Sequence, residues 1–289
     1  MTCHFIFYNV GLGQCIGVLP HDHHHAIMID CGHDGEFHPI NDFKRYLPNE
    51  VDGTRKSLRT LVLTNYDHDH FSGLPYLYDN FYIKAVLMPN NLTMDELLSL
   101  KPKYTQALHT LEKIRSSYTV SDDGYVTPYT KCVFYLTQSE LKAANIPIET
   151  NHLSQMIFIQ YGQTTVCIPG DLEDRSWELM LKKPKVCDWL RKTTVFVASH
   201  HGRQNGYHSG VFDYCKPHCI IMSDKAIMHE TQGDMSSVYA KHVNGDGITY
   251  IPRTNNPVAR KTLTTRNDGN IIMSVPMVGK PNFKAYIEQ

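Results

Sequence analysis

Four side chains of metal-binding type stand together in the sequence, at Asp67, His68, Asp69 and His70. The apolar residues 61–63 precede them and predict a buried strand that ends in this cluster. Carboxylates as close as Asp67 and Asp69 repel one another unless a cation lies between them, and carboxylate and imidazole groups are ordinary ligands of divalent cations. The pattern therefore predicts a metal centre at the end of a strand. The alternative is a solvated acidic turn in which the histidines have no ligand role.

Further apolar segments end in the same way. Three of them predict strands that stop at acids or imidazoles: 26–29 before Asp30, 164–169 before Asp171, and 195–198 before His200 and His201. Because every candidate follows a strand, we expect these side chains to converge on one edge of a β-sandwich. The alternatives are a turn or helix cap for Asp30 and a core role for the two histidines.

The order of these motifs resembles a known family. The segment Asn65-x-Asp67-x-Asp69-His70 resembles the H-x-H-x-D-H motif of the metallo-β-lactamase fold, and more closely the H-x-D-x-D-H form in the DNA-uptake protein ComEC and its soluble relatives. An asparagine stands here at the first histidine position. The resemblance runs from residue 10 to residue 272 through five more segments: Val10–Ile16 (with Gln14 in place of an acid), Asn151–Ser154, Gly170-Asp171, His200–Gly202 and the closing Thr264–Ile271, which is similar to a T-x-x-D-G-x-I strand pair.

This resemblance implies a fold and a domain organisation. The fold would be the αββα metallo-β-lactamase four-layer sandwich, an α/β architecture of two mixed β-sheets flanked by helices. The chain shows no internal repeat and no break in composition, so we expect a single domain over residues 1–289.

The resemblance also implies a ligand set. One site would consist of Asp69, His70, Asp171 and His201, with Asp171 as the bridging acid, while His200 is an alternative ligand or a proton donor. The other, first site would consist of Asp67, Asp171 and either Asn151 or His152, with Asn65 as a weak neutral partner. Asp30 would orient the metal-binding turn. One or two divalent ions are expected, and the oxygen ligands favour Mn²⁺ or Mg²⁺ with Zn²⁺ also suitable.

The chemistry implied is metal-assisted hydrolysis at Asp69 and Asp171, with His200 or His68 protonating the leaving oxygen. An oxygen-rich site suits phosphodiesters, so we expect a phosphodiesterase or nuclease whose substrate is a nucleic acid or nucleotide. A lactone, thioester or lactam hydrolase is the alternative enzyme. A metal-poor binding module is the alternative from another class, supported by Asn65 and Gln14.

A small basic patch near the end of the chain is a candidate phosphate-binding surface. Residues 251–267 contain Arg253, Arg260, Lys261 and Arg266 and no acid. Such a patch can hold phosphates, although a solvated surface explains it equally well. The net charge of −1 argues against a broadly basic surface that coats nucleic acid.

Composition predicts a cytoplasmic protein without a membrane segment. The N-terminus lacks the features of a signal peptide, and no run of 18 apolar residues occurs. Most of the 8 cysteines lie in apolar segments, which suits reduced core residues.

Local patterns predict several connecting elements. Residues 21–25 and Gly162-Gln163 fit hairpin tips, and Asp268-Gly269 fits a hairpin turn. Residues 121–124 fit a turn, and 235–242 fit a helix. A further helix is predicted by an apolar stripe at helical spacing: Tyr104, Ala107, Leu108, Leu111 and Ile114.

Overall fold

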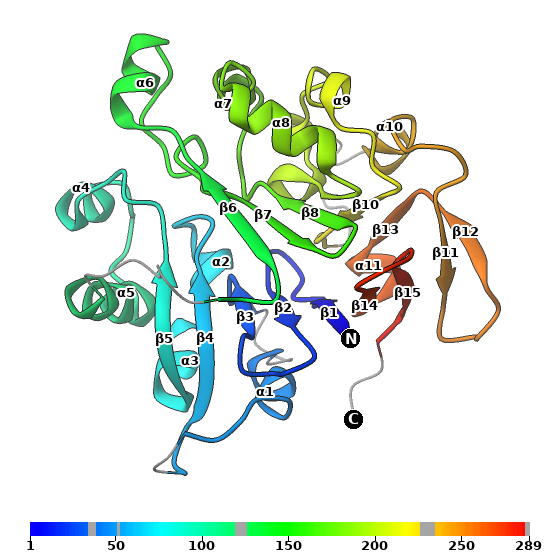
Figure 1. Cartoon of the computed structure of the whole chain (residues 1–289). Coiled ribbons are helices and arrows are strands. Elements are labelled where there is room, and N and C mark those ends of the chain that lie inside the picture. Colours follow the sequence, from blue (N-terminus) through cyan, green and yellow to red (C-terminus); the bar gives the residue numbers. More distant parts are fainter. Residues whose placement is uncertain (34–38, 51–52, 119–125, 226–234, 287–289) are drawn as a thin grey trace.

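The computed structural model describes residues 1–33, 39–50, 53–118, 126–225 and 235–286. Within this part of the chain, two β-sheets pack between two groups of helices. Helices α1, α3, α4 and α5 gather on one side, and α6 to α10 gather on the other (Figure 1). The predicted four-layer sandwich of two mixed sheets is therefore confirmed.

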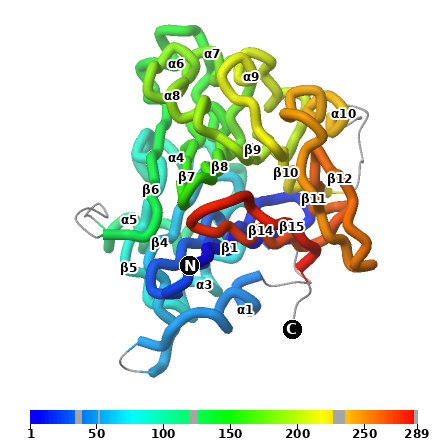
Figure 2. Tube along the Cα trace, turned by 45° about the vertical axis from the view of Figure 1, so that its right-hand side comes forward, coloured from blue at the N-terminus to red at the C-terminus, as the bar shows by residue number. Residues whose placement is uncertain are grey.

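The larger sheet has nine strands in the order β12-β11-β15-β14-β1-β2-β3-β4-β5. Its strands span these residues: β1 Thr2–Phe7, β2 Ile16–Leu19, β3 Ile27–Ile29, β4 Lys56–Val62, β5 Phe81–Leu87, β11 Ile248–Ile251, β12 Val258–Arg260, β14 Ile271–Pro276 and β15 Asn282–Ala285. The β3-β4, β4-β5 and β11-β15 pairs are parallel, and the other pairs are antiparallel. The C-terminal strand β14 lies beside the N-terminal β1, and β15 pairs with β14 on its other side (Figure 2).

The smaller sheet has six strands in the order β13-β10-β9-β8-β7-β6. Its strands span these residues: β6 Thr130–Phe134, β7 Met156–Tyr161, β8 Thr164–Ile168, β9 Val195–Val197, β10 Cys219–Met222 and β13 Thr262–Thr264. Strands β8, β9, β10 and β13 run parallel, whereas β6, β7 and β8 are antiparallel. Both sheets are therefore mixed.

The helices are short, and several have clear start signals. They span these residues: α1 Pro39–Lys44, α2 His68–Phe71, α3 Leu74–Asn80, α4 Met94–Ser99, α5 Gln106–Ser117, α6 Gln138–Ala143, α7 Asp174–Met180, α8 Pro184–Lys192, α9 Val211–Tyr214, α10 Met235–Ala240 and α11 Thr265–Asp268, with the 3₁₀ turns η1 Ser199–Gly202 and η2 Gln204–Gly206. Thr93 and Thr137 each close a capping box at the start of a helix, which satisfies backbone N–H groups that have no partner inside the helix.

Alternation along the strands divides the core into layers. In β1, Phe5 and Phe7 belong to the cluster of apolar side chains between the sheets, whereas Ile6 belongs to the cluster that includes the helices. In β8, Ile168 faces the inner cluster and Cys167 the outer one. Successive side chains of a strand point to opposite faces, so strands buried on both faces are apolar throughout.

Most of the connecting elements follow the sequence predictions. Residues 21–25 connect the antiparallel strands β2 and β3, and Gly162-Gln163 connects β7 and β8. The helix predicted at 235–242 is α10. The predicted apolar stripe is buried from Ala107 to Ile114, but Tyr104 is 55% exposed and precedes α5, so its inclusion in the stripe was wrong. The turn predicted at 121–124 lies outside the described residues.

The hairpin predicted at Asp268-Gly269 is wrong. Strand β13 before it pairs with β10 in the smaller sheet, whereas β14 after it pairs with β1 in the larger sheet. The single helical turn α11 and Gly269, with φ of 70°, carry the chain from one sheet to the other. Asp-Gly permits a left-handed turn in either connection, and the pairing partners decide which one forms.

No helix in the described part of the chain is both long enough and apolar enough to cross a membrane.

The first testable prediction concerns Gly32, which packs against the backbone of the metal-binding turn. A Cβ atom at Gly32 would lie 1.8 Å from the carbonyl oxygen of Asp69. We expect Gly32→Ala to lower the free energy of unfolding by about 1–3 kcal/mol, because the turn must move away. Urea denaturation measures the change. Gly53→Asn is the matched control, since a Cβ atom at Gly53 would meet no other atom within 4 Å and Asn tolerates the φ of 70° there; an equal loss in both variants would contradict the prediction.

Candidate metal centre

Four side chains meet at one end of the sandwich. Asp69 and His70 lie on α2 after β4, Asp171 follows β8, and His201 lies in η1 after β9. One ligand atom from each lies within 4.8 Å of the others. Strand β4 belongs to the larger sheet and β8 and β9 to the smaller one, so the cluster forms where both sheets end. These are the four residues that the sequence pattern assigned to one site.

The distances show acids and imidazoles face to face. Nε2 of His70 lies 3.1 Å from Oδ2 of Asp171, and Nε2 of His201 lies 3.5 Å from the same oxygen. Nε2 of His201 also lies 3.3 Å from Oδ2 of Asp69. Three of the four side chains are at least 96% buried, whereas the Asp69 side chain is 32% exposed. The cluster is therefore open to solvent on the side of Asp69.

The buried carboxylate of Asp30 fixes the orientation of His70. Its Oδ2 accepts hydrogen bonds from Nδ1 of His70 at 2.8 Å, from Nε2 of Gln14 at 2.8 Å and from Oγ1 of Thr64 at 2.5 Å. Its Oδ1 accepts a hydrogen bond from the backbone N–H of Thr64 at 2.7 Å. With Nδ1 of His70 bound in this way, Nε2 faces the cluster, as in the carboxylate–histidine pairs of metal sites.

Backbone contacts hold the other two segments. The backbone N–H groups of Gln14 and Cys31 donate to the carbonyl oxygens of Asp69 and His70, which attaches α2 to the loops after β1 and β3. Nδ1 of His201 donates to the carbonyl oxygen of Ser223 at 3.0 Å. His201 has a φ of 56°, and its two chain neighbours also have positive φ values. Such left-handed residues are costly and occur where the surrounding structure holds a functional side chain in place.

The charges of the cluster shift one another's pKa values. Burial alone would raise the pKa of Asp171, but His70 and His201 hold it well below its usual value. Burial alone would lower the pKa of His70, yet Asp171 and Asp30 raise it well above its usual value. Burial alone would lower the pKa of His201, but Asp171 and Asp69 raise it to about 9. Burial alone would raise the pKa of Asp69, but His201 and His70 stabilise its carboxylate and lower its pKa. Without a cation, the cluster is thus a set of ion pairs.

The donor set fits a divalent cation. Nε2 of His70 and Nε2 of His201 are buried and face carboxylate oxygens at 3.1 to 3.5 Å without the geometry of a hydrogen bond. Buried polar atoms normally have partners, so two imidazole nitrogens that point with two carboxylates at one place indicate a ligand between them. Imidazole and carboxylate together suit Zn²⁺, Mn²⁺ or another divalent metal. Binding it displaces the imidazole protons.

The residues implied for the first site are engaged elsewhere. Nδ2 of Asn65 donates to Oδ1 of Asn151 at 2.9 Å and to Oγ of Ser154 at 3.0 Å. Oδ1 of Asp67 accepts hydrogen bonds from Nζ of Lys101 at 2.5 Å and from Oγ1 of Thr150 at 2.6 Å. None of these side chains belongs to the four-residue cluster.

Asn151 and His152 were the two alternatives for one ligand of the first site. Asn151 lies beside Asn65, whereas His152 contacts helix α7. Nδ1 of His152 is hydrogen-bonded to Oγ of Ser176 at 2.8 Å in a buried position. Nδ2 of Asn151 donates to Oε1 of Glu173 at 3.1 Å.

Sequence reasoning missed Gln14 as a partner of Asp30 and Lys101 as a partner of Asp67. The family motif marks Gln14 only as a replacement for an acid. Lys101 lies 34 positions from Asp67 and follows α4 without any motif around it. No local signal could have identified its role.

The two histidines proposed as proton donors have different surroundings. Nε2 of His200 accepts a hydrogen bond from Nη1 of Arg203 at 3.2 Å, and burial lowers the pKa of His200. Both effects favour the neutral ring. His68 is exposed on α2 next to Asp69, with its ring edge-on to Phe71 at 6.1 Å. The surroundings of His200 thus count against it as a proton donor, which leaves His68 as the other candidate through its position next to Asp69 in the sequence.

The basic patch acquires acidic neighbours in the folded chain. Nη1 of Arg266 lies 3.3 Å from Oδ2 of Asp224, and Nη2 of Arg260 lies 3.8 Å from Oδ1 of Asp268. Arg253 and Lys261 are exposed. The patch is therefore less positive than the sequence suggests, because two of its arginines face carboxylates.

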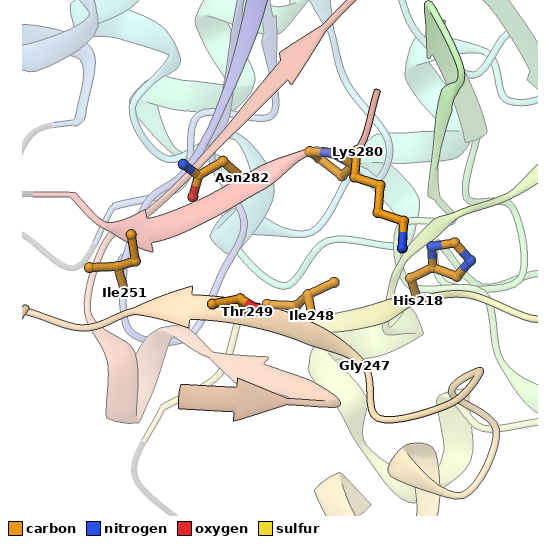
Figure 3. A pocket seen from close by; sticks show the side chains of 8 residues that line it. His218, Gly247, Ile248, Thr249, Ile251, Lys280 and Asn282 are labelled. Carbon is orange, nitrogen blue, oxygen red and sulfur yellow. The ribbon is translucent and has the colours of Figure 1, made fainter. Parts of the chain in front are cut away.

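A pocket of about 390 Å³ lies apart from these residues, beside β11 and β15 (Figure 3). The side chains of His218 and Lys280 extend toward one another at its edge. It is also lined by Ile251 and Asn282, and none of the four cluster residues lines it. The candidate metal centre and this pocket are separate features.

Comparison with known proteins identifies the family of the fold. The sequence model of the metallo-beta-lactamase superfamily matches residues 16–176, and no curated protein matches the chain. One similar solved structure is the metallo-beta-lactamase fold protein YhfI from Bacillus subtilis, with 10% identity, a TM-score of 0.46, and coverage of 84% of this chain and 94% of that chain. Zinc-bound PqqB from Methylobacterium extorquens gives 13% identity, a TM-score of 0.38, and coverage of 64% and 58%. A diphosphatase of the PhnP family gives 10% identity, a TM-score of 0.42, and coverage of 90% and 83%.

The second prediction tests Asp30 as the residue that orients His70. We expect Asp30→Asn to weaken binding of Mn²⁺ or Zn²⁺ by about 10–100-fold, because the carboxylate that fixes the ring is lost. Calorimetric titration of the metal-free protein measures the affinity. The matched control is Asp42→Asn, which removes another buried carboxylate, one that accepts hydrogen bonds from Tyr8 and Tyr286. The control should keep wild-type metal affinity; an equal loss in both would refute the assignment.

The third prediction concerns the pH dependence of stability in the metal-free protein. His201 binds its proton more tightly when folded, so its contribution to stability is fully present below 6.5 and is lost as the pH rises through about 9. In EDTA, we expect the free energy of unfolding to fall by up to about 3 kcal/mol between about pH 6 and about pH 9.5. Urea titrations at each pH measure this fall. It should be smaller in His201→Gln, and an unchanged fall in that variant would count against the ion pairs described.

Proposed function

This chain belongs to the metallo-beta-lactamase superfamily, and from that premise we propose that it hydrolyses phosphodiesters in a nucleic acid or nucleotide. The observation that carries the proposal is the cluster of Asp69, His70, Asp171 and His201. A divalent cation held by these residues would polarise a phosphoryl oxygen and acidify a water molecule. Mn²⁺ and Zn²⁺ are the cations we propose.

The residues around the cluster support an anionic substrate. Arg203 brings a permanent positive charge to His200, the chain neighbour of the cluster residue His201. A positive group near a reacting phosphate offsets the charge that develops on its oxygens. An uncharged lactone or thioester would make no use of it, so Arg203 favours a phosphate ester.

Each acid of the cluster has a distinct task in this proposal. Asp171 is buried and faces both imidazoles, so it fixes their relative position and remains ionised because its pKa is held low. Asp69 is the more exposed acid, and it lies nearest to an approaching substrate. His68, exposed and adjacent to Asp69, is the proposed proton donor to the leaving oxygen.

The fourth prediction tests this activity. We expect the protein with Mn²⁺ to cleave bis(p-nitrophenyl) phosphate, single-stranded DNA or RNA. Asp171→Asn should reduce the rate by at least about 100-fold, because it removes the carboxylate that holds both imidazoles. The release of p-nitrophenol, together with gel analysis of the nucleic acids, measures the activity.

Asp174→Asn is the matched control, because this acid lies three residues away on α7 and its side chain is 56% exposed. The control should keep the wild-type rate. Bound metal without cleavage of any phosphodiester in this panel would overturn the proposal and favour another ester class. Absence of both metal and cleavage would favour the binding module.

A further inference from the structure

The side chains implied for a first metal form a hydrogen-bonded chain with one another. Oδ1 of Asn65 accepts from the backbone N–H of Asp67 at 2.7 Å, and its Nδ2 donates to Asn151. Nδ2 of Asn151 donates to Oε1 of Glu173, which also accepts from Nδ2 of Asn205 at 2.9 Å. The side-chain oxygen and nitrogen of Asn65, and those of Asn151, are thus all hydrogen-bonded within the protein. A cation here would have to break these hydrogen bonds and would gain only neutral amide oxygens.

The remaining strong ligand implied for that site, Asp67, already has a cation. Nζ of Lys101 lies 2.5 Å from its Oδ1, and Oγ1 of Thr150 donates to the same oxygen. The Lys101 side chain is only 12% exposed and also lies 3.5 Å from Thr150. The Asp67 side chain is 34% exposed. An ammonium group on this carboxylate repels a divalent ion at the same place, and the partial burial of the pair reduces the screening of that repulsion by solvent.

The two carboxylates of the cluster match the charge of one divalent ion. Lys101 pairs with Asp67, one divalent cation offsets Asp69 and Asp171, and the buried carboxylate of Asp30 is held by hydrogen bonds from His70, Gln14 and Thr64. A second divalent ion would add two positive charges without a further carboxylate in the cluster of four. Uncompensated charge in a buried site is strongly unfavourable.

We propose that this chain binds a single divalent cation, at Asp69, His70, Asp171 and His201, and that the ammonium group of Lys101 takes the place of a first metal on Asp67. The inference rests on the metal centre proposed above but does not depend on the substrate. In this proposal Lys101 is a permanent positive charge on Asp67. Because it is part of the chain, it is present at any metal concentration.

The fifth prediction tests this stoichiometry. Protein loaded with Mn²⁺ and freed of excess metal should contain about one ion per chain, and its electron paramagnetic resonance spectrum should be that of an isolated ion. Asp67→Asn should still contain about one ion, because Asp67 is not a ligand, whereas Asp69→Ala should contain almost none. Elemental analysis measures the content. About two ions in the wild type with an exchange-coupled spectrum, or loss of the ion in Asp67→Asn, would overturn the proposal.

A gain-of-site variant tests Lys101 directly. The double variant Asn65→His with Lys101→Met supplies an imidazole and frees the carboxylate of Asp67, so it should take up a second Mn²⁺ and show a coupled spectrum. Asn65→His with Lys103→Met is the matched control, since Lys103 is an exposed lysine two residues away. The control should stay at one ion. A second ion in both variants, or in neither, would contradict the role of Lys101. A wild type with one ion and no hydrolytic activity would refute only the function proposed above.

Discussion

Opposite charges buried at one end of the sandwich are the interaction on which the rest of the structure depends. Asp171 lies against two imidazoles, His70 and His201, and all three side chains are almost fully buried. Each of these groups alone would be costly to bury, and each shifts the pKa of its neighbours toward the charged form. The cluster is stable only when its members are held together, so the strands that carry them must end at the same edge of the two sheets.

The surrounding loops supply this constraint through the backbone. Asp30 has a φ of 56° and directs its carboxylate toward His70, while His201 is also left-handed and is fixed by a backbone carbonyl. Gly32 gives room for the carbonyl oxygen of Asp69. These strained or tightly packed positions cost stability. They persist because the two sheets that pack on either side hold them in place. The metal centre is thus part of the fold and not an addition to its surface.

The neighbouring position holds the residues that, in the arrangement proposed above, replace a second metal. Asn65 and Asn151 bind one another, and Lys101 pairs with Asp67. A lysine differs from a metal ion because it cannot dissociate and cannot accept a ligand's lone pair. It therefore offsets the charge of Asp67 but supplies no Lewis acidity, so in this proposal the chemistry belongs to the single cluster.

The sequence by itself determined that apolar strands end in acids and imidazoles, and its motifs carried the family resemblance that implied the layers of the fold and the four residues of the cluster. These motifs are local, so Asp69 and Asp171 could be marked as candidates from their own segments. Only the tertiary structure decided that Asp67 pairs with Lys101, and that the turn at Asp268-Gly269 crosses between sheets. The physical reason is that a carboxylate or a turn is compatible with several partners. The choice depends on which distant segments pack beside it, and neither residue type nor spacing contains that information.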